Sequence, residues 1–237
     1  MVWSLSLPMA MAFSTRSRTI RGLAYGPGEG REIEVHAPVG ADGEAPTVVV
    51  LRPPGVGRHQ GWRSGKILAG RGLLAVVAAV GGESDALKDA AQACAWARDN
   101  AARFGGDPER LFVYGRAKGA DLAALLALDP QWLADAGAPR LSGAVGLLGH
   151  YDFGGLQAAA LARPGTPPLL LVADREDSDA GPLASALRIV GGQVAEIRCP
   201  ELEGVPLAGL LRGLRLRLIA LDEVERFIRL CSLEPAV

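Results

Sequence analysis

The sequence predicts an α/β protein with a mostly parallel sheet and helices on both of its faces. Strand-like and helix-like segments alternate along most of the 237 residues, which is the pattern of consecutive βαβ units. Segments such as Thr47–Leu51 are apolar and β-branched, as in strands that are buried on both faces. The 31 glycines and 16 prolines are spread through the chain and mark tight connections between elements.

The elements follow in chain order. Thr19–Tyr25 and Glu32–Ala37 are predicted to form antiparallel leader strands around a turn at Gly26-Pro27-Gly28. The later predicted strands are Thr47–Leu51, Gly72–Val80, Arg110–Tyr114, Ala144–Leu148, Pro168–Val172 and Gln193–Arg198. The predicted helices are Arg63–Arg71, a helix from a cap at Ser84 or Asp85 to about Phe104, Ala120–Leu128, a short helix around Trp132, Pro182–Ile189 and Leu221–Leu230. A functional site is expected where the carboxyl ends of the parallel strands meet.

Composition narrows the function classes. Hydrophobic residues make up 49% of the chain and charged residues 22%, with a net charge of −1, which is typical of a globular protein. No basic surplus favours a nucleic-acid partner, and no apolar run is long enough for a membrane span. Cys94, Cys199 and Cys231 are scattered, so we expect them to be structural. No metal-ligand spacing or nucleotide-binding fingerprint occurs, so we expect no cofactor.

The chain divides into two parts. Residues 1–17 are expected to be a disordered N-terminal extension, because a basic region at the start of a secretory signal is missing and the first cation is Arg16. Residues 18–232 are expected to form one domain, and the protein is expected to be cytoplasmic. A homodimer through edge strands or the last helix is compatible with the sequence, which does not fix the stoichiometry.

Four segments carry a resemblance to a known family. Trp96–Leu111 resembles the helix and turn before the nucleophile strand of α/β-hydrolase esterases, and Leu122–Leu133 matches the helix after it. Gly61–Lys66 resembles the end of their oxyanion loop, and Tyr151–Phe153 a signature that follows a later strand. The nearest group is the small carboxylesterases with the feruloyl-esterase-like and kynurenine-formamidase-like members of the hormone-sensitive-lipase-related branch. The resemblance covers roughly residues 20 to 230 and implies an α/β-hydrolase fold without a large cap domain.

The resemblance also assigns positions to a Ser-His-acid triad. Ala117 stands at the nucleophile position of the elbow Gly115-Arg116-Ala117-Lys118-Gly119. Asp177 aligns best with the acid, and Asp174 is the alternative. Leu207 stands at the histidine position, and no histidine follows His150. Losing one triad member lowers kcat by roughly 10⁴–10⁶-fold, and here two are replaced.

The oxyanion loop departs from the family as well. Pro53 and Pro54 follow the strand that should lead into it, and proline has no N–H to donate to an oxyanion. We therefore expect a non-hydrolytic pseudoenzyme or small-molecule-binding protein. One alternative is an enzyme that uses the remodelled pocket for non-serine chemistry. Another is a carboxylesterase-like hydrolase of small acyl esters, whose nucleophile would have to be Ser64, Ser142 or Ser178, none of which lies in an elbow motif.

Several polar residues are expected on loops at the same sheet edge. The pocket candidates are Arg58, His59, Arg116, Lys118, His150 and Asp152. If the cations converge, the pocket would bind a carboxylate or phosphate group of a small ligand. The competing interpretation is a set of solvated charges screened by salt. Without a histidine partner, Asp177 is expected to be a loop carboxylate, and His36 is expected at the surface of its leader strand.

Overall fold

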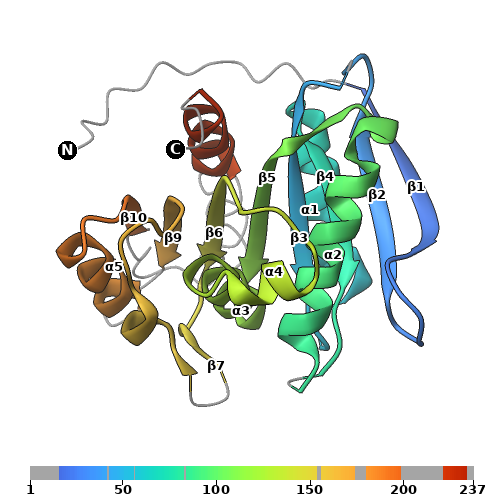
Figure 1. Ribbon diagram of the computed structural model, residues 1–237. Coiled ribbons are helices and arrows are strands. Elements are labelled where there is room, and N and C mark those ends of the chain that lie inside the picture. Colours follow the sequence, from blue (N-terminus) through green and yellow to red (C-terminus); the bar gives the residue numbers. More distant parts are fainter. Residues whose placement is uncertain are drawn as a thin grey trace, which may run out of the picture.

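An eight-stranded sheet forms the centre of the molecule, and its order is β1-β2-β4-β3-β5-β6-β9-β10 (Figure 1). The computed structural model describes residues 16–41, 43–55, 57–82, 84–153, 156–173, 180–198 and 221–233. The strands of this sheet are β1 (Ser17–Ala24), β2 (Glu32–Pro38), β3 (Ala45–Arg52), β4 (Leu74–Ala79), β5 (Gly106–Arg116), β6 (Gly143–Leu147), β9 (Leu169–Ala173) and β10 (Val194–Arg198). β2 pairs antiparallel with β1 and β4, and every other pairing is parallel. The predicted mostly parallel sheet is confirmed.

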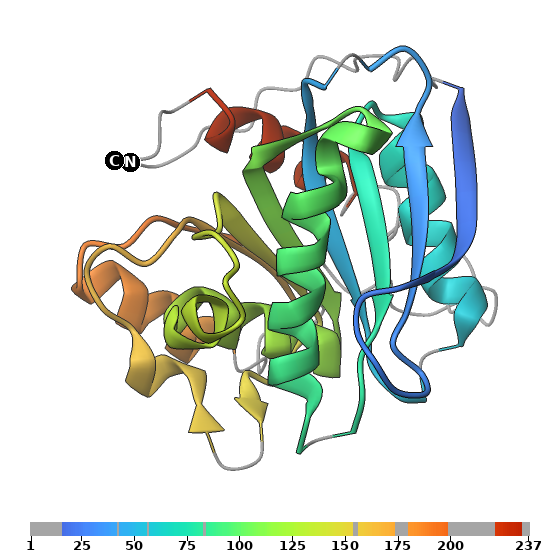
Figure 2. The same cartoon turned by 45° about the vertical axis from the view of Figure 1, so that its right-hand side comes forward.

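Helices cover both faces of this sheet (Figure 2). They are α1 (Arg58–Gly70), α2 (Ala86–Ala101), α3 (Lys118–Leu128), α4 (Gln131–Asp135), α5 (Ala180–Ile189), the short 3-10 helices η1 (Ala102–Phe104) and η2 (Ala158–Leu161), and a helix over residues 221–231. Residues of α2, α3 and α5 share one core cluster, whereas α1 and the helix over 221–231 share the other. Alternate residues of β3 point into the two cores, Val49 into the first and Val50 into the second.

The described residues contain no large cap domain. A small antiparallel pair, β7 (Asp152–Phe153) with β8 (Leu156–Gln157), follows β6 and was not predicted. Within the described segments, no helix is both long and apolar enough to cross a bilayer. Cys94 is fully buried in the core, where burial raises the pKa of its thiol to about 12, and this confirms its predicted structural role.

The predicted start of α1 and the predicted cap of α2 need correction. α1 begins at Arg58 rather than at Arg63, because Gly61 and Gly65, which disfavour a helix in isolation, let it pack closely on the sheet. A Cβ at Gly65 would lie 2.4 Å from the His36 ring. Asp85 precedes α2 as predicted, but its side chain makes no capping hydrogen bond.

The prediction that His36 lies at the surface is wrong. Its side chain is 0% exposed between β1 and α1. Nδ1 lies 3.0 Å from the Thr19 hydroxyl, and Nε2 lies 2.9 Å from a carboxylate oxygen of Glu34. Burial lowers the pKa of His36 below its ordinary value of 6.5, against the opposing effect of Glu34.

Candidate functional site at the strand-to-helix elbow

The connection from β5 to α3 is a single residue, Ala117. Its backbone angles are φ 50° and ψ −124°, the conformation of the first central residue of a type II′ turn, which glycine normally occupies. A side-chain-bearing residue in such a sparsely populated region costs of order 1–3 kcal/mol. The N–H of Ala117 donates to the carbonyl of Leu147 at 2.8 Å, and its own carbonyl accepts from Ala120 at 2.8 Å. Strand β6 and the first turn of α3 therefore hold the strained conformation in place.

The two elbow glycines allow this turn. A Cβ at Gly115 would lie 1.8 Å from the carbonyl oxygen of Gly119, so a side chain there would displace the backbone. Gly119 lies close to the neighbouring strand, because a Cβ at this position would be 3.2 Å from the carbonyl oxygen of Leu51. The predicted sharp turn over Gly115–Gly119 is confirmed, and its shape is that of the nucleophile elbow.

Ala117 is exposed at this elbow, together with Arg116 and Lys118 on either side of it. A methyl group carries no lone pair and no transferable proton, so it can neither attack a carbonyl carbon nor be activated by a base. The elbow thus keeps the backbone of the nucleophile position and lacks the atom that performs the chemistry.

A buried carboxylate that the sequence analysis missed shapes the neighbouring loop. Asp121, in the first turn of α3, is 3% exposed and accepts the backbone N–H of Tyr151 at 2.7 Å. It also accepts the backbone N–H of His150. Burial raises the pKa of Asp121, although these two hydrogen bonds oppose the shift. A Cβ at Gly149 would lie 2.8 Å from the same carboxylate oxygen, which explains why the loop needs glycine there.

This loop over residues 148–151 is itself unusual. Leu148 and Tyr151 have positive φ angles of 55° and 54°. The Tyr151 ring is buried and its hydroxyl donates to the carbonyl of Gly146 at 3.2 Å. Because Tyr151 and Asp121 anchor the loop from inside, His150 and Asp152 are left exposed on either side of Tyr151.

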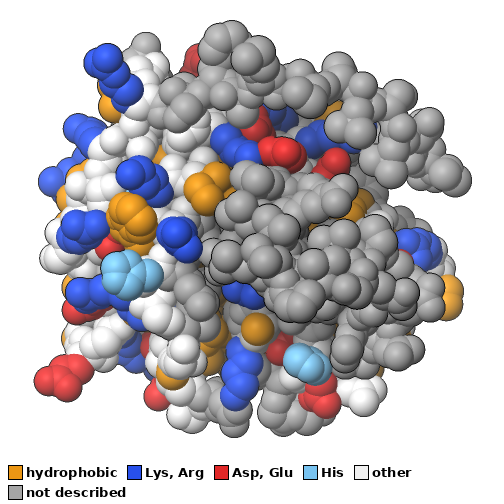
Figure 3. All heavy atoms as spheres, turned by 180° about the vertical axis from the view of Figure 1, so that it is seen from behind, with side chains coloured by type: hydrophobic (Ala, Val, Ile, Leu, Met, Phe, Trp, Pro, Cys, Tyr) orange, Lys and Arg blue, Asp and Glu red, His pale blue; other side chains and the backbone are white. Residues whose placement is uncertain are grey.

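The other two pocket candidates lie elsewhere on the elbow edge. Arg58 and His59 are the first two residues of α1 and are exposed. The Arg58 guanidinium forms an ion pair with Glu32 at the start of β2, so it is already neutralised. Figure 3 shows Lys and Arg side chains along the side of the molecule that β1 and α1 form; the exposed ones of these two elements are Arg18, Arg21, Arg58, Arg63 and Lys66. Arg18 lies toward the opposite edge of the sheet.

A second buried carboxylate, that of Asp89, connects two segments at the elbow edge of the sheet. Asp89 of α2 accepts the N–H of Gly81 at 2.9 Å, and its other oxygen lies 2.9 Å from Arg31 Nε in the turn between β1 and β2. The nearby Tyr25 hydroxyl donates to the carbonyl of Ala79. These contacts bind the β1–β2 hairpin to the loop after β4, and we assign them a structural role.

The remaining triad positions, Asp177 and Leu207, lie outside the described residues, as do Asp174 and Ser178. Of the other serines considered, Ser142 precedes β6 at the opposite edge of the sheet, where its hydroxyl contacts the Glu109 carbonyl at 3.3 Å. Ser64 lies in the middle of α1. Neither serine therefore stands at the elbow. In the described segments, no group of three or more His, Cys, Asp and Glu side chains is placed to hold a metal ion.

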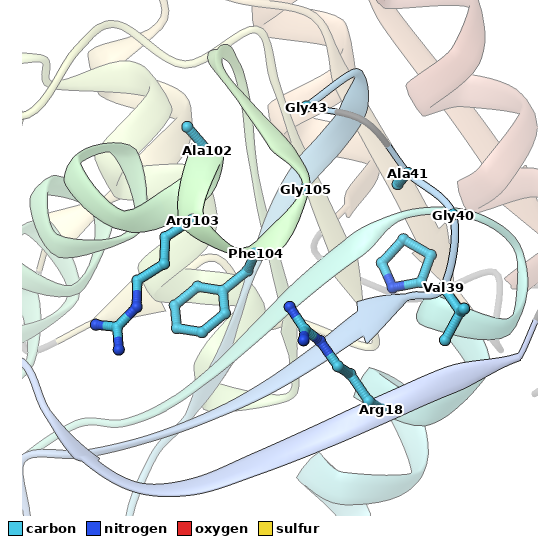
Figure 4. A pocket seen from close by; sticks show the side chains of 10 residues that line it. Arg18, Val39, Gly40, Ala41, Gly43, Ala102, Arg103, Phe104 and Gly105 are labelled. Atoms are coloured by element: carbon cyan, nitrogen blue, oxygen red, sulfur yellow. The ribbon is translucent and has the colours of Figure 1, made fainter.

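Two cavities, of about 610 and 370 Å³, lie at the edge of the sheet opposite the elbow. The larger is lined by the end of β2 and by η1 (Figure 4). The smaller lies below the end of α3, next to the segment that leads into β9.

Comparison with known proteins agrees with this geometry. A family model described as alpha/beta hydrolase fold matches residues 84–179, which include the elbow. The chain is similar to the probable isoprenylcysteine alpha-carbonyl methylesterase ICMEL1 of Oryza sativa subsp. japonica, at 32% identity over 118 residues, 46% of this chain and 27% of that protein. The isoprenylcysteine alpha-carbonyl methylesterase ICME of Arabidopsis thaliana is 28% identical over 131 residues, 52% of this chain and 31% of its own. The chain thus matches less than a third of the length of these relatives.

Solved structures share the fold over nearly the whole chain. A truncated carbohydrate esterase from gut microbiota superposes with a TM-score of 0.72 at 12% identity, covering 95% of this chain and 99% of that one. At this identity the likeness concerns the fold alone. Together, the sheet topology, the family model over residues 84–179 and these likenesses show an α/β-hydrolase fold, in which the chain resembles the carboxylesterases.

Proposed function

We propose that this chain is a non-hydrolytic member of the superfamily, which binds a small organic anion at the elbow and does not cleave it. The observation that carries the proposal is Ala117, which occupies the nucleophile position in the nucleophile's backbone conformation and carries no heteroatom. The loss of the histidine at Leu207, inferred from the sequence, removes the general base as well.

The charges around the elbow support an anionic ligand. Arg116 and Lys118 are exposed on either side of Ala117, and α3 begins directly after it. The N-terminus of a helix carries a partial positive charge, which adds to these two cations. A carboxylate is therefore the preferred ligand group, because it accepts charge-assisted hydrogen bonds from both side chains.

A competing function is suggested by the relatives, which are named as esterases. Hydrolysis of small acyl esters would need a nucleophile from outside the elbow, since no oxygen or sulfur atom is available at position 117. An enzyme with non-serine chemistry would use four exposed side chains, those of His59, Lys118, His150 and Asp152.

Binding and turnover measured on one sample separate these functions. Butyrate, titrated calorimetrically at low salt, should bind the wild-type chain and raise its unfolding temperature. Lys118→Gln and Arg116→Gln should each weaken binding about three- to tenfold, because each removes one charged donor. Arg63→Gln on α1 is the matched control and should leave binding unchanged. Sustained release of p-nitrophenol from p-nitrophenyl butyrate, or binding that is insensitive to both elbow variants, would contradict the proposal.

A further inference from the structure

The larger cavity lies on the edge of the sheet opposite the elbow, so it plays no part in the site above. It has a volume of about 610 Å³, within the range of roughly 300–1,000 Å³ usual for small-molecule sites. Its walls come from the end of β2 with the following turn, from Arg18 of β1 and from the turn between η1 and β5. These segments meet beside the amino ends of β3 and β5.

Two guanidinium groups border this cavity. Figure 4 shows Arg18 and Arg103 extending on either side of the Phe104 ring. Arg103 is held over that ring at 5.4 Å from its centroid, a cation–π contact. Among the described residues, neither arginine has a carboxylate partner. Two nearby acids are engaged by other arginines, Asp99 by Arg98 at 2.8 Å and Asp107 by Arg110 at 2.6 Å.

The floor of the cavity is apolar and firmly held. Phe104 is 6% exposed and stacks on Trp96, with ring centroids 6.2 Å apart. Gly105 has a φ of +84°, and a Cβ there would lie 2.4 Å from the carbonyl oxygen of Ala41, so the two walls approach as closely as glycine permits. Val39 at the rim is 55% exposed, an apolar side chain without cover.

We propose that this cavity is a binding site for a small phosphate monoester with an apolar or aromatic substituent. Two guanidinium groups that have no carboxylate partner among the described residues match the charge of a phosphate dianion and can each donate two hydrogen bonds to its oxygens. Val39 and the Phe104 floor would contact the substituent. The site is independent of the elbow and of the function proposed for it.

Phenyl phosphate is the probe that tests this site, by calorimetric titration of the full chain at low salt. It should bind at millimolar concentration or below. Arg18→Gln and Arg103→Gln should each weaken binding about tenfold, the effect expected from losing one charge-assisted contact. Both side chains are exposed, so the variants should keep the wild-type unfolding temperature. Arg63→Gln, an exposed arginine of α1 outside the cavity, should change binding less than about twofold.

Three results would overturn the proposal. The first is no heat of binding at millimolar phenyl phosphate. The second is equal affinity for inorganic phosphate, which would remove the role of the apolar floor. The third is binding that Lys118→Gln abolishes while Arg18→Gln and Arg103→Gln leave it intact, which would move the anion to the elbow.

Discussion

Replacing Ala117 by glycine should stabilise the protein, opposite to the usual effect of glycine. Alanine at φ 50° and ψ −124° carries strain of order 1–3 kcal/mol, which glycine does not, since it has no Cβ. Glycine loses about 0.5–1 kcal/mol more backbone entropy on folding. The methyl group of Ala117 is exposed, so its removal leaves no cavity. The net expectation is a gain of about 0.5–2 kcal/mol in the free energy of unfolding.

Urea unfolding at equilibrium measures this difference, provided that the transition has a single step. A gain of this size should raise the unfolding temperature by about 1–8 °C for a domain of this length. Ala134→Gly is the matched control, because Ala134 is exposed within the regular helix α4. It should lose about 0.5–1 kcal/mol.

The two variants therefore move in opposite directions if the elbow is strained. If Ala117→Gly lowers the free energy of unfolding as much as Ala134→Gly does, the strained conformation does not exist in solution. The chain would then not keep the backbone conformation of a nucleophile position.

Three further perturbations test the elbow glycines and two buried ionisable side chains, Asp121 and His36. Gly115→Ala should lower the free energy of unfolding by about 3 kcal/mol, because its Cβ would overlap a backbone oxygen, whereas Gly119→Ala should stay within about 1 kcal/mol of wild type in the same urea titration. Because the pKa of Asp121 is raised in the folded state, its favourable contribution to the free energy of unfolding is complete below pH 3.8 and is lost as pH rises through the folded-state pKa. Asp121→Asn should therefore flatten this part of a plot of the free energy of unfolding against pH. The lowered pKa of His36 means that stability is lost as pH falls below 6.5 towards the folded-state pKa, and His36→Gln should remove this loss when unfolding is followed between those values.

Much of the fold could be predicted because strands that are buried on both faces of the sheet are continuous apolar runs in the sequence. The run Val48-Val49-Val50 could only be a central strand, and the structure places it between β4 and β5. The start of α1 was missed because its two interior glycines lower helix propensity, and only their close packing explains them, Gly61 against Val77 and Gly65 against His36. The burial of His36 itself depends on α1 lying over its strand, which its own sequence neighbourhood does not reveal.

Part of the candidate site could also be predicted, because its turn depends on glycines that are visible in the sequence. The glycines of Gly115–Gly119 predict the turn, and Gly115 in particular is required by a close backbone approach. The role of Asp121 could not be predicted, because its partners Tyr151 and His150 lie in a loop about 30 residues further along the chain. The ion pair of Arg58 with Glu32 likewise depends on where α1 begins relative to β2.

The central claim is that the elbow holds no nucleophile, and covalent labelling tests it most directly. The purified chain is incubated with excess fluorophosphonate and its intact mass is measured, with an active serine esterase treated in parallel. The account predicts no mass increase in this chain and full labelling of the esterase. A stoichiometric adduct that maps to a serine of this chain would contradict the account and identify the protein as a working serine hydrolase.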